Sequence, residues 1–339
     1  MTEPGAETAG ATVHLRPDQN PVLSVRSLQV GFGSMSSRVQ AVDDVSFDVL
    51  DGETVGLVGE SGCGKSTTGL SILQLPPPDS GSIEFEGREL TTLSANELRT
   101  VRPRLQMIFQ DPVSALNPRR RIVDIVREGL AISGDRVSED DPRVLEAMTA
   151  VGLDPALVAN RRPHEFSGGQ CQRICIARAL IMNPRLVICD EPVSALDVSI
   201  QAQILNLLED AKDRYRLSLL FISHDLAVVS NVSDRVIVMY AGTICEVAET
   251  MALFDRPAHP YTRVLLGAIP GSGEAADEQS ERPADGAFAG AIRATSSGCP
   301  FLARCPNADA RCAVERPQLR RLADGHFVAC HHPLGTFAA

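Results

Sequence analysis

The chain has 339 residues, of which 44% are hydrophobic and 22% charged, values typical of globular rather than disordered proteins. Its formal net charge of −11 argues against a protein that mainly coats nucleic acid. No apolar run in the sequence approaches the ~18 residues that cross a bilayer, and residues 1–20 lack the basic and apolar parts of a signal peptide. Nine cysteines without a secretion signal favour reduced thiols or metal ligands over disulfides. We therefore expect a soluble, intracellular globular protein.

Composition and hydrophobic pattern divide the chain into four segments. Residues 1–21 are rich in Ala, Gly, Thr and Glu and predict a disordered lead-in. Residues 22–270 alternate short β-branched runs with helical periodicity, which predicts an α/β fold around a largely parallel sheet. Residues 271–290 are rich in Gly, Ala and acidic side chains and predict a linker. Residues 291–339 form a C-terminal extension that holds four of the nine cysteines.

The expected elements can be placed from hydrophobic periodicity and from turn residues. In chain order they are strands at 22–30, 39–49 and 54–58, a helix at 65–73, a strand at 104–109, helices at 122–131, 143–151 and 169–182, a strand at 185–189, a helix at 199–214, and strands at 217–223, 236–240 and 243–247. The first helix must end before the three prolines at 76–78. The last two strands are separated by Ala-Gly, which predicts a hairpin.

A phosphate-binding pattern follows the predicted strand at 54–58. The stretch from Gly59 to Ser66 fits G-x-x-x-x-G-K-[ST] and opens a helix, which is the context that the motif requires. Glycines let backbone N–H groups surround a phosphate, and the helix N-terminus adds partial positive charge. Lys65 would contact the β- and γ-phosphates, and Ser66 would ligate Mg²⁺. The predicted nucleotide-binding residues are Gly59, Ser61, Gly62, Cys63, Gly64, Lys65, Ser66 and Thr67.

Two carboxylates end the predicted buried strand at 185–189. Asp190 is placed to hold Mg²⁺, and Glu191, one residue further, is placed to polarise the water that attacks a γ-phosphate. Alone, a strand that ends in Asp-Glu is equally well an ordinary solvated turn. Because a phosphate-binding loop precedes it in the same chain, we favour the catalytic interpretation.

Four further motifs occur in a fixed order between and after these two. They are Phe109-Gln110-Asp111-Pro112, Ser167-Gly168-Gly169-Gln170, Ser194-Ala195-Leu196-Asp197 and Ser223-His224-Asp225. Together with the phosphate loop and the paired carboxylates, they resemble the ABC ATPases over residues 22–270. The resemblance implies an ATP and Mg²⁺ site, with a helical subdomain that carries the Ser-Gly-Gly-Gln signature.

The resemblance also assigns roles to individual residues. Glu191, His224 and Gln110 would be catalytic, and Mg²⁺ would be held by Ser66, Gln110 and Asp190. In this family two ATPase domains dock head to tail, so the signature of one covers ATP held by the other. The residues implied for that role are Ser167, Gly168, Gly169, Gln170 and Asp197.

Three positions leave alternatives open. Phe32 lies in the region of the adenine-stacking aromatic but is equally well a core residue. Cys63 is either a small residue chosen to fit the loop or a reactive thiol whose pKa is lowered by a helix N-terminus. Cys171 follows the signature where close relatives more often carry Arg, so a charged donor would be lost beside the dimer interface.

The subfamily is indicated by longer runs. Residues 109–118, 193–203 and 259–262 are similar to peptide-importer ATPases, and residues 298–306 resemble the oligopeptide/dipeptide transporter C-terminal extension. Residues 77–81 point to the F-type ATPase of such systems. The resemblance implies a peripheral subunit on the cytoplasmic face of the membrane that powers import of di- or oligopeptides. Its partners would be a second, non-identical ABC ATPase, two transmembrane permease subunits and, through the complex, an extracytoplasmic peptide-binding protein.

A different functional class remains as the alternative, namely a soluble ABC ATPase that acts on nucleic acid or ribosomes. That class usually carries two ATPase sets in one chain or a long coiled-coil insertion, and this sequence has neither. We therefore expect no nucleic-acid partner. The six arginines of residues 291–339 stand against Asp309, Glu315 and Asp324, and we expect them to form solvated surface.

The four cysteines of the extension are Cys299, Cys305, Cys312 and Cys330. Four thiols within about 30 residues suggest a metal site. The C-x₂₋₄-C knuckles of structural zinc are absent among these four cysteines, and prolines follow two of them, which favours a [4Fe–4S] cluster. Zinc, with help from His331 and His332, and uncommitted thiols are the open alternatives.

Overall fold

The computed structural model describes residues 10, 12–34, 38–269 and 297–335. These residues form two compact units. The first unit contains the described residues of 1–50, 54–91 and 223–339, and the second contains 51–53 and 92–222. The C-terminal extension therefore belongs to the same unit as the phosphate-binding loop.

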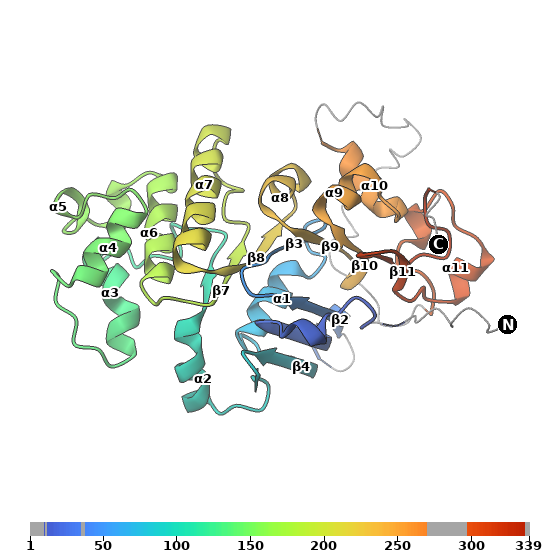
Figure 1. Cartoon of the computed structure of the whole chain (residues 1–339), viewed down its shortest axis with the longest axis horizontal. Helices are drawn as coiled ribbons and strands as arrows, with labels where there is room; N and C mark the ends of the chain where they lie inside the picture. Colours follow the sequence, from blue (N-terminus) through green and yellow to red (C-terminus); the bar gives the residue numbers. More distant parts are fainter. Residues whose placement is uncertain (1–9, 11, 35–37, 270–296, 336–339) are drawn as a thin grey trace. The chain divides into compact units, whose positions relative to one another are not determined.

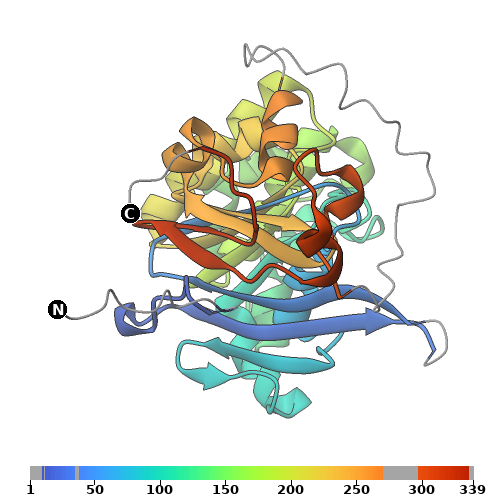
Figure 2. The same ribbon diagram turned by 90° about the vertical axis from the view of Figure 1, so that its right-hand side faces the viewer.

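The first unit contains an antiparallel sheet in the order β2-β1-β4-β5 (Figures 1 and 2). Its strands are β1 (Leu23–Phe32), β2 (Val39–Val49), β4 (Ser80–Phe85) and β5 (Arg88–Glu89). Residues such as Val25, Val45 and Phe47 are fully buried and form the core face of β1 and β2. The sequence predicted β1 and β2 but not β4 and β5, because only Ile83 and Phe85 of β4 are buried and the apolar pattern is weak.

Five strands of a second sheet also lie in the first unit, in the order β11-β12-β10-β9-β3. They are β3 (Thr54–Val58), β9 (Arg235–Tyr240), β10 (Thr243–Glu249), β11 (Arg320–Ala323) and β12 (His326–Val328). β3 is parallel to β9, and β9 and β10 form the predicted hairpin. β12 pairs antiparallel with β10, and β11 with β12, so the extension continues this sheet (Figure 2).

The helices of the first unit are short. They are α1 (Lys65–Ile72), α8 (Leu226–Val232), α9 (Thr250–Asp255), α10 (Pro260–Gly267) and α11 (Ala310–Val314), with 3₁₀ turns at Pro17–Gln19 and Leu302–Arg304. The buried carboxylate of Glu246 in β10 accepts hydrogen bonds from His259 N (2.8 Å) and Thr262 Oγ1 (2.6 Å), and lies 2.7 Å from His326 Nε2. One buried residue thus ties both α10 and the extension to β10.

The expectation of a disordered lead-in over residues 1–21 is wrong for residues 12–21. His14 is 3% exposed, and its Nε2 lies 2.7 Å from Ser46 O. Arg16 forms an ion pair with Asp48 at 2.8 Å. Both partners lie on β2, 32 residues away, and local composition carries no signal for such a contact. Residues 1–9 and 11 and the predicted linker 271–290 lie outside the described residues.

The second unit joins three parallel strands to a group of helices. The strands run in the order β8-β7-β6 and are β6 (Leu105–Ile108), β7 (Leu186–Asp190) and β8 (Ser218–Ser223). The helices are α2 (Ala95–Val101), α3 (Ile122–Ile132), α4 (Pro142–Ala150), α5 (Pro155–Val158), α6 (Gly168–Leu180) and α7 (Val198–Tyr215), with 3₁₀ turns at Arg102–Arg104 and Pro163–Glu165. Helices α3 to α6 gather in one cluster (green in Figure 1). The predicted elements of this unit agree with the observed bounds to within two residues.

Candidate nucleotide site

The phosphate-binding loop connects β3 to α1 in the first unit. Its first and last glycines cannot be replaced without a clash. A Cβ at Gly59 (φ 153°) would lie 2.2 Å from Met239 O, and one at Gly64 (φ 104°) would lie 2.2 Å from Ala41 O. The loop is therefore pressed against backbone on two sides, which explains the glycines of the sequence pattern.

Lys65 is the first residue of α1 and is only 4% exposed. Its Nζ donates hydrogen bonds to Gly59 O at 2.7 Å and to Glu60 O at 2.9 Å. The side chain therefore folds back over the loop that precedes it. This is the place where the motif puts the β- and γ-phosphates of a nucleotide.

The reactive-thiol interpretation of Cys63 is wrong. The side chain is 6% exposed. Its pKa is raised, because burial outweighs the nearby ammonium of Lys65, whose Nζ lies 3.8 Å from Sγ. A buried thiol in the neutral form is a weak nucleophile, so Cys63 serves as a small residue that fits the loop.

Two other predicted residues belong to the first unit. His224 is exposed and directly follows β8, and the next residue, Asp225, accepts a hydrogen bond from Ala227 N at 2.8 Å to begin α8. Phe32 ends β1 and is 48% exposed. The core interpretation of Phe32 is therefore wrong, and an exposed ring of this kind is available for stacking on a base.

In the second unit, the predicted catalytic carboxylates end β7. Asp190 is 6% exposed and Glu191 8%. Gln110, 81 residues earlier, donates from Nε2 to Glu191 Oε2 at 2.9 Å. Glu191 also has a positive φ of 47°, a conformation that is uncommon for residues other than glycine and costs free energy. The structure thus brings Gln110 and Glu191 together.

The signature begins helix α6 in the same unit. Ser167 and Gln170 form a reciprocal capping box, with Ser167 N donating to Gln170 Oε1 at 3.0 Å and Gln170 N to Ser167 Oγ at 3.3 Å. Ser167, Gly168 and Gln170 are exposed, whereas Gly169 is buried. The signature therefore presents polar groups to solvent from a fixed helix start.

Asp197 caps the next long helix. Its Oδ1 accepts hydrogen bonds from Ile200 N (3.0 Å) and Ser199 Oγ (2.7 Å), which makes it the N-cap of α7. The side chain of Ile200 in turn touches the signature, since a Cβ at Gly169 would lie 2.6 Å from Ile200 Cγ2. The two predicted interface motifs are thus packed against each other.

Cys171, the residue that follows the signature, is buried although its neighbour Gln170 is exposed. It is 1% exposed, and its Sγ lies 3.6 Å from Pro163 O. Burial is also the main cause of its raised pKa. The position therefore packs as a small apolar residue inside the second unit.

The four cysteines of the extension line one small cavity, together with His259, His331 and His332. Cys312 and Cys330 are buried, and Cys299 and Cys305 are half-buried. Burial raises the pKa of Cys330 to about 11, and the neighbouring thiols add to this effect. Residues spaced over 32 positions of sequence are therefore brought to a single place in the fold.

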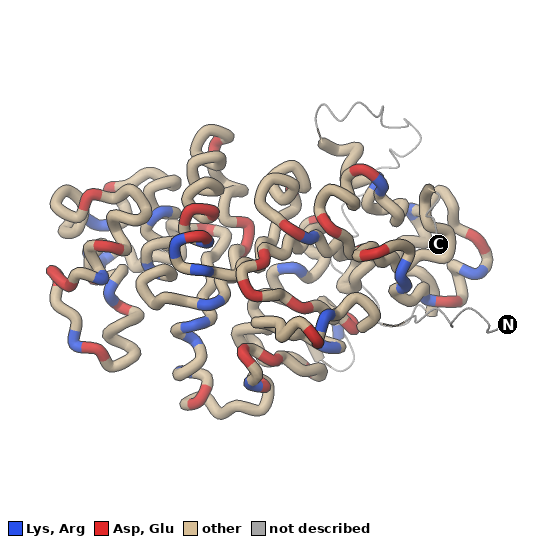
Figure 3. Tube along the Cα trace, viewed as in Figure 1, with Lys and Arg blue, Asp and Glu red and all other residues tan. Residues whose placement is uncertain are grey.

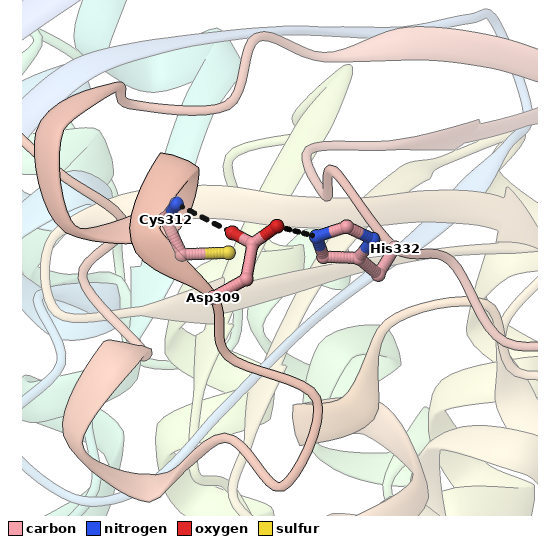
Figure 4. A group of neighbouring side chains, drawn as sticks. All are labelled: Asp309, Cys312 and His332. Carbon is pink, nitrogen blue, oxygen red and sulfur yellow. Dashed lines mark hydrogen bonds and ion pairs between the residues drawn. The ribbon is translucent and has the colours of Figure 1, made fainter.

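A second possible ligand set overlaps the first (Figure 4). Asp309, Cys312 and His332 have ligand atoms within 4.8 Å of one another. Asp309 Oδ2 lies 2.9 Å from His332 Nε2, and its Oδ1 accepts a hydrogen bond from Cys312 N at 2.9 Å. The sequence did not single out Asp309 as a ligand, since it precedes α11 as an ordinary helix cap.

Basic and acidic residues both occur along the described part of the extension (Figure 3). Among its described residues, four arginines form ion pairs with carboxylates. The pairs are Arg304–Glu60, Arg311–Glu315, Arg316–Asp43 and Arg321–Asp324. The local excess of positive charge is therefore distributed among acidic neighbours. No helix among the described residues is long and apolar enough to cross a membrane.

A phosphate-binding loop between a strand and a helix, with a strand-end Asp-Glu pair, defines a P-loop ATPase. Sequence comparison specifies the class further. Residues 42–194 match the ABC transporter family, and residues 245–312 match the family described as oligopeptide/dipeptide transporter, C-terminal region. The chain belongs to the ABC transporter family, and within it to the ATP-binding subunits of the oligopeptide/dipeptide branch. It is an ABC-type ATPase.

Relatives and a solved structure agree with this assignment. A peptide import ATP-binding protein of Brucella ovis is 50% identical over 313 residues, 92% of this chain and 98% of that protein. The oligopeptide transport ATP-binding protein AppF of Bacillus subtilis is 47% identical, over 86% and 89% of the two chains. The ATP-binding cassette MJ0796, solved as a dimer with ADP and Pi, superposes with a TM-score of 0.61 and 27% identity, over 67% of this chain and 98% of that one. The predicted family and fold class are confirmed.

Proposed function

We propose that this chain hydrolyses ATP to power import of peptides through a membrane permease complex, as one half of a head-to-tail ATPase dimer. The observation that carries the proposal is the Gln110–Glu191 contact at the end of β7, in a chain that also holds a complete phosphate-binding loop. The relatives named for oligopeptide transport and peptide import supply the substrate class.

In the first unit we assign Lys65 and the backbone of residues 59–67 to the phosphates of ATP, and Phe32 to the adenine. Lys65 already points over the loop, where a positive charge stabilises negative charge that develops on the phosphates. His224, exposed at the end of β8, is assigned to the γ-phosphate.

In the second unit we assign Glu191 as the general base. Its carboxylate would accept the proton of the attacking water, and Gln110 would keep the carboxylate in place through the 2.9 Å hydrogen bond. Gln110 and Asp190 of this unit carry oxygen atoms of the kind that Mg²⁺ prefers, and Ser66 of the first unit carries another. When bound with ATP, Mg²⁺ would supply positive charge that offsets the negative charge of the phosphates.

The dimer is inferred from exposure of the signature and of Asp197. Ser167, Gly168, Gln170 and Asp197 are exposed, although they are held rigidly by two helix caps. The chain has one set of motifs, so these groups need a second ATPase to act on. The cassette MJ0796 was solved as a dimer.

We infer that the second ATPase is not identical to this chain. The other inferred partners are two permease subunits in the membrane and a peptide-binding protein outside it, and this chain would lie on the cytoplasmic face of that membrane as a peripheral subunit.

Purification of the complex from native membranes tests this function. We expect the chain to co-purify with two transmembrane proteins and a second ABC ATPase, and the ATPase rate to rise when peptide and binding protein are added. Co-purification with ribosomes or nucleic acid would instead support the alternative class. An ATPase rate that does not respond to any peptide length would contradict the substrate assignment.

For the extension we propose a [4Fe–4S] cluster held by Cys299, Cys305, Cys312 and Cys330. The support is that all four thiols line one cavity and are at least half-buried, which suits cysteine ligation of such a cluster. Zinc at Asp309, Cys312 and His332 is a second candidate, because a carboxylate, a thiol and an imidazole are ordinary zinc ligands and their ligand atoms lie within 4.8 Å of one another.

Two substitutions separate these sites. Cys305 belongs only to the four-thiol set, and His332 is a ligand candidate only in the second set. After anaerobic purification, we expect Cys305→Ser to remove iron, acid-labile sulfide and the brown absorption, while His332→Ala and the core control Cys175→Ser retain them. Zinc that is retained in Cys305→Ser and lost in His332→Ala would contradict the cluster. A wild-type chain without either metal would contradict both sites.

A further inference from the structure

The C-terminal extension contacts the phosphate-binding loop directly. Arg304 donates from Nη1 to Glu60 Oε2 at 2.8 Å and from Nη2 to Glu60 Oε1 at 2.9 Å. This bidentate pair joins residues 244 positions apart, both in the first unit. Glu60 is the second residue of the loop. A residue of the cysteine-containing extension thus holds the loop that binds phosphate.

A second contact fixes the same residue from α10. The backbone N of Glu60 donates a hydrogen bond to Tyr261 Oη at 2.8 Å. Its carbonyl oxygen accepts from Lys65 Nζ at 2.9 Å. Glu60 is therefore held by Tyr261 at its N–H, by Lys65 at its carbonyl and by Arg304 at its carboxylate. The lysine ammonium and the Glu60 carboxylate are therefore both held on one short stretch of the loop.

The segment that carries Arg304 is anchored by aromatic packing. Phe301 is 2% exposed and packs against Tyr240 and Tyr261, with ring centroids 5.2 and 5.5 Å apart. The Arg304 guanidinium lies over the rings of Tyr240 and Phe301, at 5.8 and 5.7 Å. The rings of Tyr240 and Phe301 therefore both support the guanidinium, and a fixed position favours a bidentate pair with a carboxylate.

The charge of Glu60 gives this contact a consequence for binding. Glu60 carries a carboxylate next to a loop that must accept a triphosphate, and like charges in such a site repel. The guanidinium of Arg304 compensates that charge. The hydrogen bond to Glu60 raises the pKa of Arg304, so it stays protonated. Both side chains are about 40% exposed (39% and 43%), so solvent screens the pair and the effect is modest.

We propose that Arg304 is a positioning residue for the ATPase reaction, which holds and neutralises Glu60 so that the phosphate-binding loop accepts ATP. The inference deepens the proposed function, since it takes ATP as the ligand of this loop. It also gives the extension a role at the nucleotide site. No contact of Arg304 with nucleotide is implied, because it acts through Glu60.

The test compares Arg304→Ala with Arg311→Ala in the full-length chain. Arg311 is a matched control, because it also precedes a tail cysteine and forms a bidentate pair with a carboxylate, Glu315, at 2.8 Å. We expect Arg304→Ala to weaken ATP binding about two- to fivefold and ADP binding less, because ADP carries less charge. The kcat should stay near the wild-type value while KM rises. Arg311→Ala should bind both nucleotides like the wild type.

A second substitution distinguishes charge from a general loss of structure. In the double variant Glu60→Gln/Arg304→Ala, the carboxylate that needs compensation is gone, so we expect ATP affinity to return to the wild-type value. Glu60→Gln alone should also bind ATP normally, and it covers the case in which Arg304→Ala does not fold. The proposal is overturned if Arg304→Ala binds ATP like the wild type, if both arginine variants lose affinity equally, or if the double variant stays weak. A wild-type chain that binds no ATP would instead overturn the proposed function.

Discussion

At the scale of single residues, the nucleotide site depends on a few side chains held by contacts that are distant in sequence. Glu191 shows this most clearly. It ends a buried strand in a left-handed conformation, and Gln110 from another strand end binds its carboxylate. A carboxylate that is held in place in this way is suited to accept a proton from water.

We therefore expect Glu191→Gln to lower the rate of ATP hydrolysis by about 10²- to 10⁴-fold, the usual contribution of a general base. ATP binding should be retained, because the amide has the same size. Phosphate release and nucleotide binding measured on the same preparation check this. The control is Glu209→Gln, an exposed glutamate on α7. Turnover of Glu191→Gln within a factor of about two of the control would remove Glu191 from the mechanism.

At the scale of secondary-structure elements, the start of α6 is packed against the start of α7. Gly169 is the contact point, because there is room there for a hydrogen but not for a Cβ, which would lie 2.6 Å from Ile200 Cγ2. Gly168, one residue earlier, faces ordinary space, with Leu196 Cδ2 at 3.6 Å from a Cβ built there. The signature sequence thus contains one glycine required by packing and one that packing does not require.

This difference predicts unequal effects of alanine. Gly169→Ala should lower the free energy of unfolding by about 1–3 kcal/mol through overpacking, whereas Gly168→Ala should change it little. Urea unfolding of both variants measures this. Ile200→Ala removes the clashing methyl group, so in the background of that variant Gly169→Ala should cost less. Equal destabilisation by both alanines would show that the contact with Ile200 is not the cause.

At the scale of the whole molecule, two buried histidines attach separate segments of the chain to the core of the first unit. His14 anchors residues 12–21 on β2, and His259 begins α10, where its Nδ1 accepts a hydrogen bond from Tyr261 N at 3.0 Å. Burial lowers the pKa of each histidine to about 4. Both are therefore neutral in the folded protein at neutral pH, while in the unfolded chain they titrate near 6.5.

The direction of the pH dependence follows from these values. A histidine whose pKa is lower in the folded protein than in the unfolded chain binds a proton more readily when the chain unfolds. Its contribution to the free energy of unfolding is therefore fully present above pH 6.5 and is lost as the pH falls from 6.5 to about 4. Each histidine contributes up to about 3 kcal/mol over this range.

His259→Asn keeps a helix-capping acceptor but cannot titrate. Urea unfolding at several pH values should show a shallower loss for His259→Asn than for the wild type, and the exposed control His164→Asn should leave the slope unchanged. An unchanged slope in His259→Asn would contradict the assignment.

Much of the fold could be predicted from local pattern. In the second unit, the strands β6 to β8 and the helices α3, α4, α6 and α7 match the expected ranges because the apolar pattern of each is clear, and Ser167 and Asp197 also mark the starts of α6 and α7. The helices α2 and α5, of 7 and 4 residues, were not predicted because they are too short for periodicity to stand out. β4 and β5 escaped prediction because too few of their side chains are buried. The helices α8 to α10 are too short, at 6 to 8 residues, for periodicity to stand out.

The candidate site divides in the same way. The types and the order of its residues could be predicted from the sequence, but the burial and the contacts of each side chain could not. Cys63 was open to two interpretations until burial decided its pKa, and Phe32 until its exposure excluded the core. The roles of Asp309 and Arg304 could not be predicted from the sequence. Asp309 contacts His332 and Cys312, and Arg304 contacts Glu60, only because the fold brings these residues together.

The sequence by itself determined the family, the phosphate-binding loop and the order of the catalytic motifs, because these depend on residue types at short, fixed spacings. Only the tertiary structure decided that residues 12–21 pack on β2, that four tail thiols line one cavity, and that Arg304 holds Glu60. The physical reason is that burial, pKa and ion pairing depend on which distant surfaces meet. The net charge of −11 does not show that four arginines of the extension pair with acidic side chains, one of which lies in the phosphate-binding loop.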